Sequence, residues 1–207
     1  MGFREAILKI PFAYRTFALA VGRFGLSRLE LYAKYLPYTP GTQILDLGCG
    51  TGNSTSFFQP QDYLGIDISQ RYVKSARIQH PNHRFECIDF RELKLSSNIV
   101  PDNGFGVVLA YGLMHHLDDN TSFKFFQKAY ELMPLGGHIV CFDGCIYQGQ
   151  NTIKQKLILK DRGEFIRTPE QLTKIAHSAG FECQNMIEEN SLIIPYSLLA
   201  LSGKRKA

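Results

Sequence analysis

A glycine-rich turn directly after an apolar, strand-like segment constrains this chain more than any other feature. The turn, Asp46-Leu-Gly-Cys-Gly-Thr-Gly52, follows the apolar segment Gln43–Leu47. Alternating glycines allow positive φ and remove the Cβ atoms that would keep a ligand off the main chain. Polar residues across 53–58 predict that a helix begins next. A strand, a turn and a helix around a bound ligand are therefore expected. The candidate ligand contacts in the turn are Asp46, Gly48, Cys49, Gly50 and Gly52.

The glycine spacing differs from that of two common phosphate-binding motifs. A dinucleotide fingerprint would need its third glycine where Asn53 stands. A P-loop would need a lysine after its turn, and no lysine occurs between Thr42 and Arg71. The turn thus indicates a nucleotide-type cofactor but neither of these motifs.

Two further apolar segments also end in acidic residues. The segment 63–67 ends in Asp67, and the segment 83–88 is followed by Asp89 and Phe90. In a doubly wound sheet, ligands bind at the carboxyl ends of the strands, where the strand order reverses. Asp67 suits ribose hydroxyls, whereas Asp89 and Phe90 suit the amino group and ring face of an adenine. Each aspartate alone is better explained as a helix cap; together with the glycines they favour a ligand site.

These residues resemble the class I S-adenosylmethionine-dependent methyltransferases. The match is closest at Ile44–Gly52 and extends over residues 42–195. It implies an α/β fold with a Rossmann-like, doubly wound, seven-stranded and mostly parallel sheet in a single domain, and S-adenosylmethionine as the cofactor. The family's acidic position after the second strand corresponds to Asp67, with Ile68 beside it. Its fourth strand corresponds to 105–111, which adds Ala110 to the cofactor contacts.

Two departures from the family pattern concern the second half of the chain. The turn before the fifth strand carries an extra residue, Leu135. The segment 146–167 matches no general family motif, so we expect acceptor choice to reside there. Its charged residues Arg162, Glu164 and Arg167 either contact an acceptor or keep a loop solvated, and the solvated loop is the simpler interpretation.

The segment 112–119 resembles a histidine turn found in small-molecule members of the family. Methyl transfer from a sulfonium requires mainly positioning of the reactants, but an acceptor that must lose a proton also needs a base. The candidate bases are His116 and His115, and Tyr111 is a candidate to order the acceptor or stack on the cofactor. Adjacent residues on a helical turn point in different directions, so at most one histidine should face the pocket. The alternative is structural: the histidines bond backbone carbonyls, and Tyr111 lies at the core edge.

Composition agrees with one cytoplasmic domain. The chain has 207 residues, 44% of them hydrophobic, and no apolar run that approaches a membrane span. Its five cysteines lack the spacing of a zinc cluster. We expect Cys141 and Cys145 to be core residues. Asp118-Asp-Asn120 predicts a helix cap rather than a metal site, so no metal is predicted.

The net charge of +4 is unevenly distributed. Residues 1–40 and Lys204-Arg-Lys206 are basic, and the remainder is net negative. A nucleic-acid partner is not expected, because the domain itself lacks a basic face. The predicted division is an N-terminal helical extension at 1–40, a methyltransferase domain at 41–200 and a solvated basic tail at 201–207. The last two strands are expected at 180–186 and 191–196.

The N-terminal extension has the pattern of one or two amphipathic helices, divided at Pro11. It is a lid over the cofactor, a surface helix in weak contact with an anionic membrane, or a helix packed on the sheet. The resemblance favours the lid, which would place Phe12 and Tyr14 near the methionine end of the cofactor.

The predicted function is therefore methyl transfer from S-adenosylmethionine to an oxygen or nitrogen of a small molecule, a lipid or biosynthetic intermediate included. A methyltransferase that acts on a protein, a non-catalytic cofactor-binding partner subunit and an NAD or nucleotide-sugar enzyme on the same fold are the alternatives. Neither the acceptor nor the oligomeric state follows from the sequence.

Overall fold

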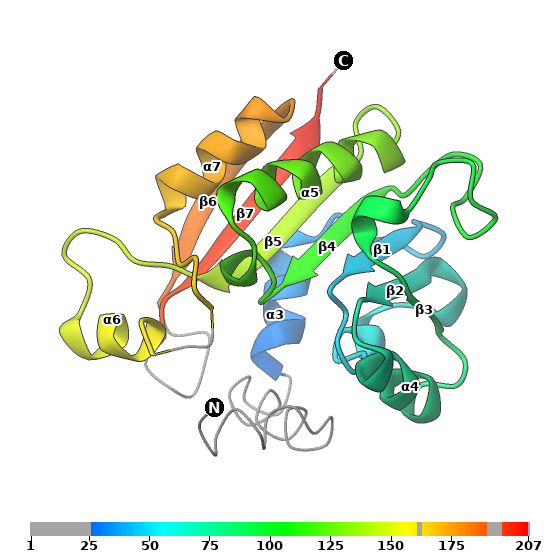
Figure 1. The fold of residues 1–207 in the computed structure, drawn as a ribbon, viewed down its shortest axis with the longest axis horizontal. Coiled ribbons are helices and arrows are strands. Elements are labelled where there is room, and N and C mark those ends of the chain that lie inside the picture. The colour runs from blue at the N-terminus through cyan, green and yellow to red at the C-terminus, as the bar shows by residue number, and fades with distance from the viewer. Residues whose placement is uncertain (1–25, 161–162, 190–195, 207) are drawn as a thin grey trace.

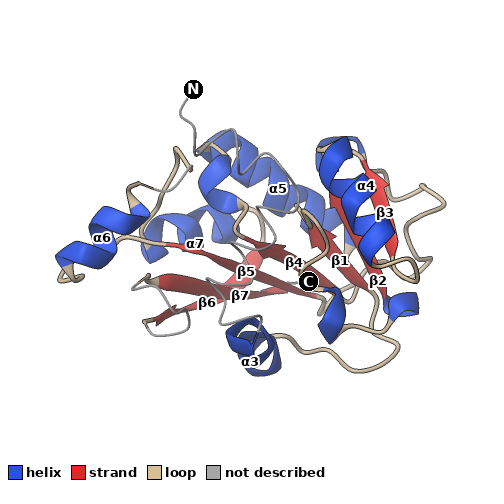
Figure 2. Ribbon diagram, turned by 90° about the horizontal axis from the view of Figure 1, so that it is seen from below, coloured by secondary structure: helices blue, strands red, loops and turns tan. Residues whose placement is uncertain are grey.

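A seven-stranded sheet with helices on both faces forms the body of the protein. The computed structural model describes residues 26–160, 163–189 and 196–206. The strand order is β3-β2-β1-β4-β5-β7-β6, in which β7 is antiparallel to both neighbours and the other pairs are parallel (Figure 1). Helix α3 lies on the opposite side of the sheet from α5 and α7 (Figure 2). The predicted Rossmann-like, doubly wound and mostly parallel sheet is confirmed.

Helices and strands are interspersed along the described chain. Their bounds are α3 Leu26–Tyr35, β1 Ile44–Leu47, β2 Tyr63–Asp67, α4 Gln70–Gln79, β3 Arg84–Cys87, β4 Val107–Tyr111, α5 Asp119–Leu132, β5 His138–Gly144, α6 Thr152–Ile158, α7 Pro169–Ser178, β6 Phe181–Glu188 and β7 Leu198–Arg205. Short 3₁₀ turns lie at η2 Thr55–Phe57, η3 Pro60–Asp62, η4 Phe90–Glu92 and η5 Met114–His116. Among the described residues, no helix has the length and apolar character needed to cross a bilayer.

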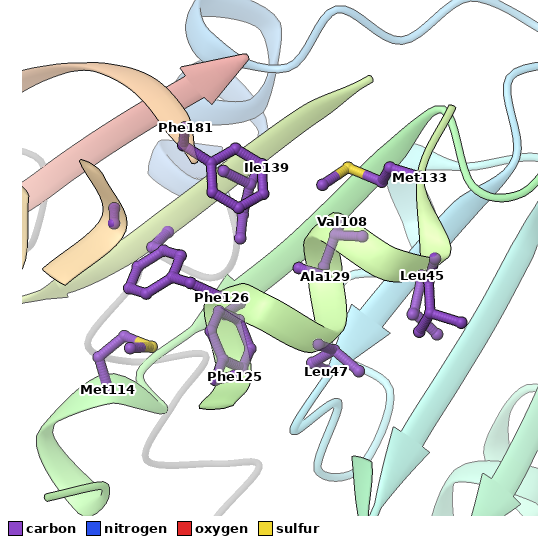
Figure 3. Packing of buried hydrophobic residues seen from close by; sticks show 14 of the residues in the cluster. Leu45, Leu47, Val108, Met114, Phe125, Phe126, Ala129, Met133, Ile139 and Phe181 are labelled. Atoms are coloured by element: carbon purple, nitrogen blue, oxygen red, sulfur yellow. The ribbon is translucent and has the colours of Figure 1, made fainter. Parts of the chain in front are cut away.

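The central strands are mostly apolar because both faces of the sheet are covered. All four residues of β1 are buried. Leu45 and Leu47 belong to a cluster on one face, where α5 contributes Phe125 and Phe126 (Figure 3). Ile44 belongs to the cluster on the other face, with residues of α3 and α4. The core is therefore two layers separated by the sheet.

The order of the strands reverses at β1. The chain passes from β1 through β2 to β3 and then returns to β4, which pairs with the free side of β1. Asp46 in β1 is in register with Leu109 in β4 and with Gly65 in β2. The carboxyl ends of β1, β2 and β4 consequently lie side by side, as expected for a ligand site in such a sheet.

The helix predicted to begin at Asn53 does not form. The chain instead makes the two short 3₁₀ turns η2 and η3 before it enters β2. Pro60 accounts for the break, because a proline disfavours helical dihedrals in the preceding residue, and Gln59 is extended with φ −69° and ψ 141°. Phe57 and Phe58 pack against Tyr32 of α3, with ring centroids 5.3 and 5.9 Å from it. Aromatic packing takes the place of helical hydrogen bonds here.

The C-terminal segment differs from the prediction as well. Strand β7 occupies Leu198–Arg205, between β5 and β6. The basic tail predicted at 201–207 is therefore wrong for residues 201–205, which are paired on both sides. The cationic residues Lys204-Arg-Lys206 suggested a solvated tail, but the apolar run before them, Leu198–Leu201, is buried. The strand predicted at 191–196 lies almost wholly outside the described residues.

Helix α7 shows the local chemistry expected of a helix start and end. Thr168 forms a capping box with Gln171, and a proline occupies the first turn. The helix ends at Ser178, and Gly180 has φ 96° immediately before β6. Strand β6 at Phe181–Glu188 confirms the strand predicted at 180–186.

A buried carboxyl group lies within the sheet. Asp46 of β1 is 1% exposed, and its Oδ2 accepts a hydrogen bond of 2.7 Å from the Tyr63 hydroxyl. Burial raises the pKa of Asp46 to about 6, although hydrogen bonds from Tyr63 and Ser54 oppose the rise. The sequence assigned Asp46 to the cofactor; in the structure its carboxyl group is held by a neighbouring strand.

Replacing Leu201 tests whether β7 is a structural strand. Leu201 is fully buried, so Leu201→Ala should lower the free energy of unfolding by about 2–5 kcal/mol through lost burial and the cavity left behind. Urea denaturation measures the change. Lys206→Ala, at an exposed residue just past the strand, is the control and should change stability by less than about 0.5 kcal/mol. Equal effects of the two substitutions would contradict the assignment.

Replacing Asp46 tests the buried carboxyl group. Because the folded protein holds this proton up to a higher pH than the unfolded chain, wild-type stability falls as the pH rises from about 4 through about 6. Asp46→Asn cannot ionise and escapes this loss. From about pH 5 to about pH 7.5, the stability of the wild type relative to the variant should drop by about 1 kcal/mol. A pH-independent difference in urea denaturation would show that Asp46 titrates normally.

Candidate functional site

The glycine turn has the backbone geometry that its sequence predicts. Gly48, Gly50 and Gly52 have φ of 73°, 56° and 81°, a region that favours glycine. The N–H groups of Gly48 and Cys49 both donate to the carbonyl of Ile66, at 2.9 and 3.1 Å. The turn is thereby fastened to β2, and the side chains of Leu113 and Phe85 pack against Gly48 and Gly52.

Asp67 lies directly against this turn. Its Oδ2 accepts the Gly50 N–H at 3.0 Å and its Oδ1 accepts the Ser69 N–H at 2.8 Å. Partial burial raises the pKa of Asp67, while these two backbone hydrogen bonds oppose the rise. The neighbouring Ile68 is 74% exposed. The structure thus brings Asp67, Ile68 and Gly50 together at the end of β2.

Asp89 and Phe90 follow β3, the next strand outward. Asp89 forms an ion pair with Arg91, and this contact lowers the pKa of Asp89. Phe90 packs edge-on against Phe125, with ring centroids 5.8 Å apart. Because Cys87 of β3 is in register with Asp67, this pair lies one strand away from the ribose-suited carboxylate.

Two other predicted cofactor contacts have a packing role. Cys49 is buried, and a Cβ on Gly65 would come within 2.9 Å of its Sγ. Ala110 is 1% exposed and belongs to the core cluster that includes α5. Tyr14 and Phe12 lie outside the described residues.

Helix α3 places a cation at the end of β4 that the sequence reasoning missed. The Arg28 guanidinium lies 3.8 Å from the ring centroid of Tyr111. Tyr32, one turn later on α3, contacts the same ring edge-on, with centroids 6.3 Å apart. The i, i+4 spacing of Arg28 and Tyr32 is the signal that was available, since such residues share a helix face.

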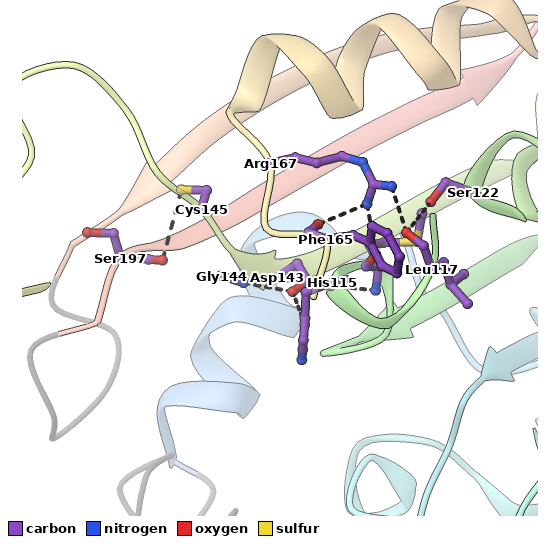
Figure 4. A network of polar contacts seen from close by, with 10 residues as sticks. His115, Leu117, Ser122, Asp143, Gly144, Cys145, Phe165, Arg167 and Ser197 are labelled. Atoms are coloured by element: carbon purple, nitrogen blue, oxygen red, sulfur yellow. Dashed lines mark hydrogen bonds and ion pairs between the residues drawn. The ribbon is translucent and has the colours of Figure 1, made fainter. Parts of the chain in front are cut away.

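The histidine turn η5 separates the two candidate bases. His115 is 8% exposed and its Nδ1 bonds to the Asp143 carboxylate (Figure 4). His116 is exposed, and its ring centroid lies 4.1 Å from that of His115. A carboxylate can only accept, so the His115 Nδ1 carries the proton and Nε2 retains its lone pair. The sequence placed His116 first, whereas the structure gives His115 the ordered environment.

Asp143, at the end of β5, organises the whole turn. Its Oδ2 accepts the N–H groups of Met114 and His115 at 2.6 and 3.2 Å, and its Oδ1 accepts the Gly144 N–H at 2.9 Å. The sequence analysis gave Asp143 no role in the site. The available signal was that β5, like β1 and β2, carries an aspartate near its carboxyl end.

The segment before α7 is docked on the histidine turn, not solvated. Arg167 is 7% exposed, and its Nη1 and Nη2 donate to the carbonyls of Met114 and Leu117 at 2.9 and 2.6 Å. The solvated interpretation of Arg167 is therefore wrong. Glu164 is exposed, as that interpretation expected, and Arg162 lies outside the described residues.

Residues considered for metal binding have other partners. Asp118 caps α5 by accepting the Thr121 N–H at 2.7 Å, as predicted. Cys141 and Cys145 are 1% and 0% exposed and belong to the core cluster. Within the described part of the chain, no group of three metal-ligating side chains comes together.

Comparison with known proteins agrees with this geometry. Residues 44–137 match the family model described as a methyltransferase domain. The phosphoethanolamine N-methyltransferase of Triticum aestivum is 26% identical over 161 residues, which are 76% of this chain and 31% of that protein. The trans-aconitate 2-methyltransferase of Deinococcus radiodurans is 38% identical over 73 residues, 33% of this chain and 28% of its own. The chain spans about a third of the length of these curated relatives.

Solved structures share the fold. A phosphoethanolamine N-methyltransferase 2 from Haemonchus contortus, in complex with S-adenosyl-L-methionine, superposes with a TM-score of 0.71 at 14% identity, over 100% of this chain and 60% of that one. Human N-acetylserotonin methyltransferase in complex with the same cofactor gives 0.67 at 17% identity, over 98% and 58%. The predicted resemblance is confirmed: residues 44–137 match a methyltransferase domain, and the fold is that of solved S-adenosylmethionine-dependent methyltransferases.

Proposed function

We propose that the protein transfers the methyl group of S-adenosylmethionine to an amine or hydroxyl group of a small molecule, with His115 as the general base. The observation that carries the proposal is the His115–Asp143 pair, held directly beside the glycine turn. A Cβ on Gly48 would come within 2.9 Å of Leu113, so the histidine turn and the glycine turn are in contact. A cofactor on one turn therefore lies next to a base on the other.

The residues around the glycine turn fit this cofactor. The positive φ angles at Gly48, Gly50 and Gly52 give the turn a tight bend that other residues would strain, and Leu113 and Phe85 pack against Gly48 and Gly52. Asp67 is placed to accept ribose hydroxyls. Asp89 and Phe90, with the exposed Ile68, are placed for the adenine. The bound cofactor supplies a methyl group already activated on a sulfonium.

Arg28 is the proposed partner for the carboxylate at the amino-acid end of the cofactor. The strand ends nearby carry the carboxyl groups of Asp46, Asp67 and Asp143, so a bound carboxylate needs a compensating cation. The Arg28 guanidinium lies over the ring of Tyr111, at the end of β4. Strand β4 pairs with β1, which leads into the glycine turn. A guanidinium presents paired N–H donors that match a carboxylate.

Replacing Arg28 should weaken one ligand selectively. Arg28→Gln removes a charged hydrogen bond worth about 1.5–3 kcal/mol, so the affinity for S-adenosylhomocysteine should fall roughly 10-fold to 100-fold. The affinity for 5′-methylthioadenosine, which lacks the amino-acid group, should stay within about twofold. Isothermal titration calorimetry measures both. Lys34→Gln, at an exposed lysine on the same helix, should change neither. An equal loss for both ligands would show that Arg28 only supports the fold.

The base follows from the tautomer of His115. Asp143 holds the Nδ1–H, which leaves Nε2 to accept a proton from the acceptor as the new bond to carbon forms. Relatives named phosphoethanolamine N-methyltransferase and ubiquinone biosynthesis O-methyltransferase support an amine or a hydroxyl as the acceptor group.

Replacing the two histidines separately tests the base. His115→Ala should lower kcat about 10²-fold to 10⁴-fold, the usual contribution of a general base, with unchanged affinity for S-adenosylhomocysteine. His116→Ala should lower it by less than about threefold. Release of S-adenosylhomocysteine is measured with phosphoethanolamine, ethanolamine and a catechol as acceptors. A His115→Ala rate within threefold of wild type refutes the base, and no transfer to any acceptor counts against the small-molecule proposal.

A further inference from the structure

We infer that Arg167 is a positioning residue that fixes the orientation of His115. The inference rests on the proposed function, because it concerns the residue assigned as the base. Arg167 lies in the segment 146–167, which matches no general family motif. Its side chain nonetheless reaches into the histidine turn from the side opposite Asp143 (Figure 4).

Each nitrogen of the Arg167 guanidinium donates a hydrogen bond in this turn or next to it. Nη1 donates to the carbonyls of Met114 and Phe165 at 2.9 and 3.2 Å, and Nη2 donates to the carbonyl of Leu117 at 2.6 Å. Nε donates to the Asp119 carboxylate at 2.9 Å. Met114 and Leu117 bracket the two histidines. Arg167 therefore fixes the turn on both sides of His115 with one rigid, planar group.

The backbone next to Arg167 adds a second set of contacts. The Phe165 N–H donates to the His115 carbonyl at 3.0 Å. A Cβ on Gly163 would overlap the His115 ring, so only glycine lets the main chain lie against the imidazole. The Ile146 N–H donates to the Arg167 carbonyl at 3.2 Å, which fastens the same segment to the end of β5. Residues 163–167, here called the strap, therefore pack closely across the histidine turn.

The turn needs this support because it is only one 3₁₀ turn long. Short 3₁₀ segments have poor internal hydrogen-bond geometry and little stability of their own. Asp143 satisfies the N–H groups of Met114 and His115, whereas Arg167 satisfies the carbonyls of Met114 and Leu117. Donors and acceptors of the turn are therefore held from opposite sides. Loss of the arginine releases one side only.

The surroundings of His115 define what a measurement there reports. Asp143 from β5 and His116 from the same turn contact the His115 ring. Arg167 lies beside the ring, where it pairs with Asp119 of α5. Tyr111 lies near Asp143. His115, Asp143 and Arg167 also line one cavity of about 10 Å³, room for about one water molecule. A structural change in the strap should therefore alter the environment of the imidazole through only a few contacts.

The test reads the imidazole directly in the full-length protein. Long-range ¹H–¹⁵N spectra of histidine-labelled protein at about pH 8, above the ordinary titration range of histidines, should show a single His115 tautomer with the proton on Nδ1. Arg167→Gln should shift the ratio of the two tautomers by about threefold or more, while S-adenosylhomocysteine affinity stays within about twofold. Arg167→Lys, which keeps the charge but lacks the planar fork of donors, should fall between wild type and Arg167→Gln.

Two further variants complete the design. Gly163→Ala forces the strap and the ring apart, so it should change the tautomer ratio even if Arg167→Gln folds poorly. Arg77→Gln is the matched control, because Arg77 also bonds a backbone carbonyl and a carboxylate but lies on α4; it should leave the spectrum of His115 unchanged.

The outcomes separate this inference from the proposed function. A single Nδ1–H tautomer retained in both Arg167→Gln and Gly163→Ala overturns the inference, whatever happens to stability. A changed ratio in Arg77→Gln does so as well, since it would mark a general response to destabilisation. Failure of His115→Ala to slow methyl transfer removes the base and leaves the spectroscopic result standing on its own.

Discussion

The parallel pairing of β1 with β2 on one side and β4 on the other is the constraint on which the rest of the structure depends. The backbone hydrogen bonds of β1 bring the glycine turn, Asp67 and the histidine turn to a single edge of the sheet. A change of register by one residue would turn Leu45 and Leu47 to the other face of the sheet and move Asp46 away from Tyr63 into the cluster beside α5. The site is therefore located by the core and not by its own contacts.

Functional groups at this edge are held mainly by carboxylates that accept backbone N–H groups. Asp67 binds the glycine turn to β2, and Asp143 binds the histidine turn to β5. In each case one carboxylate orders a short, irregular segment that lacks regular secondary structure. Such segments carry function because they are exposed at strand ends, and they keep their shape because a rigid neighbouring strand supplies the acceptor.

Charge at this edge is balanced by arginines from two distant parts of the chain. Arg28 comes from the helix before β1, and Arg167 comes from the strap before α7. The planar guanidinium of Arg28 lies over a tyrosine ring, and that of Arg167 donates to a pair of carbonyls. Neither belongs to a family motif, yet each lies beside one of the two turns that define the proposed site.

The sequence alone determined the sheet, the family and the cofactor, because glycine spacing and strand-ending acids are local patterns with one common structural outcome. It also determined the cap of α5, since Asp118 acts within a few residues of itself. Tertiary structure decided the rest. Pro60 and aromatic packing removed the helix expected after Asn53, and pairing with β5 and β6 turned a basic tail into β7. Which histidine is ordered, and whether Arg167 is solvated, depended on Asp143 and on carbonyls about fifty residues away, and no local pattern records contacts of that range.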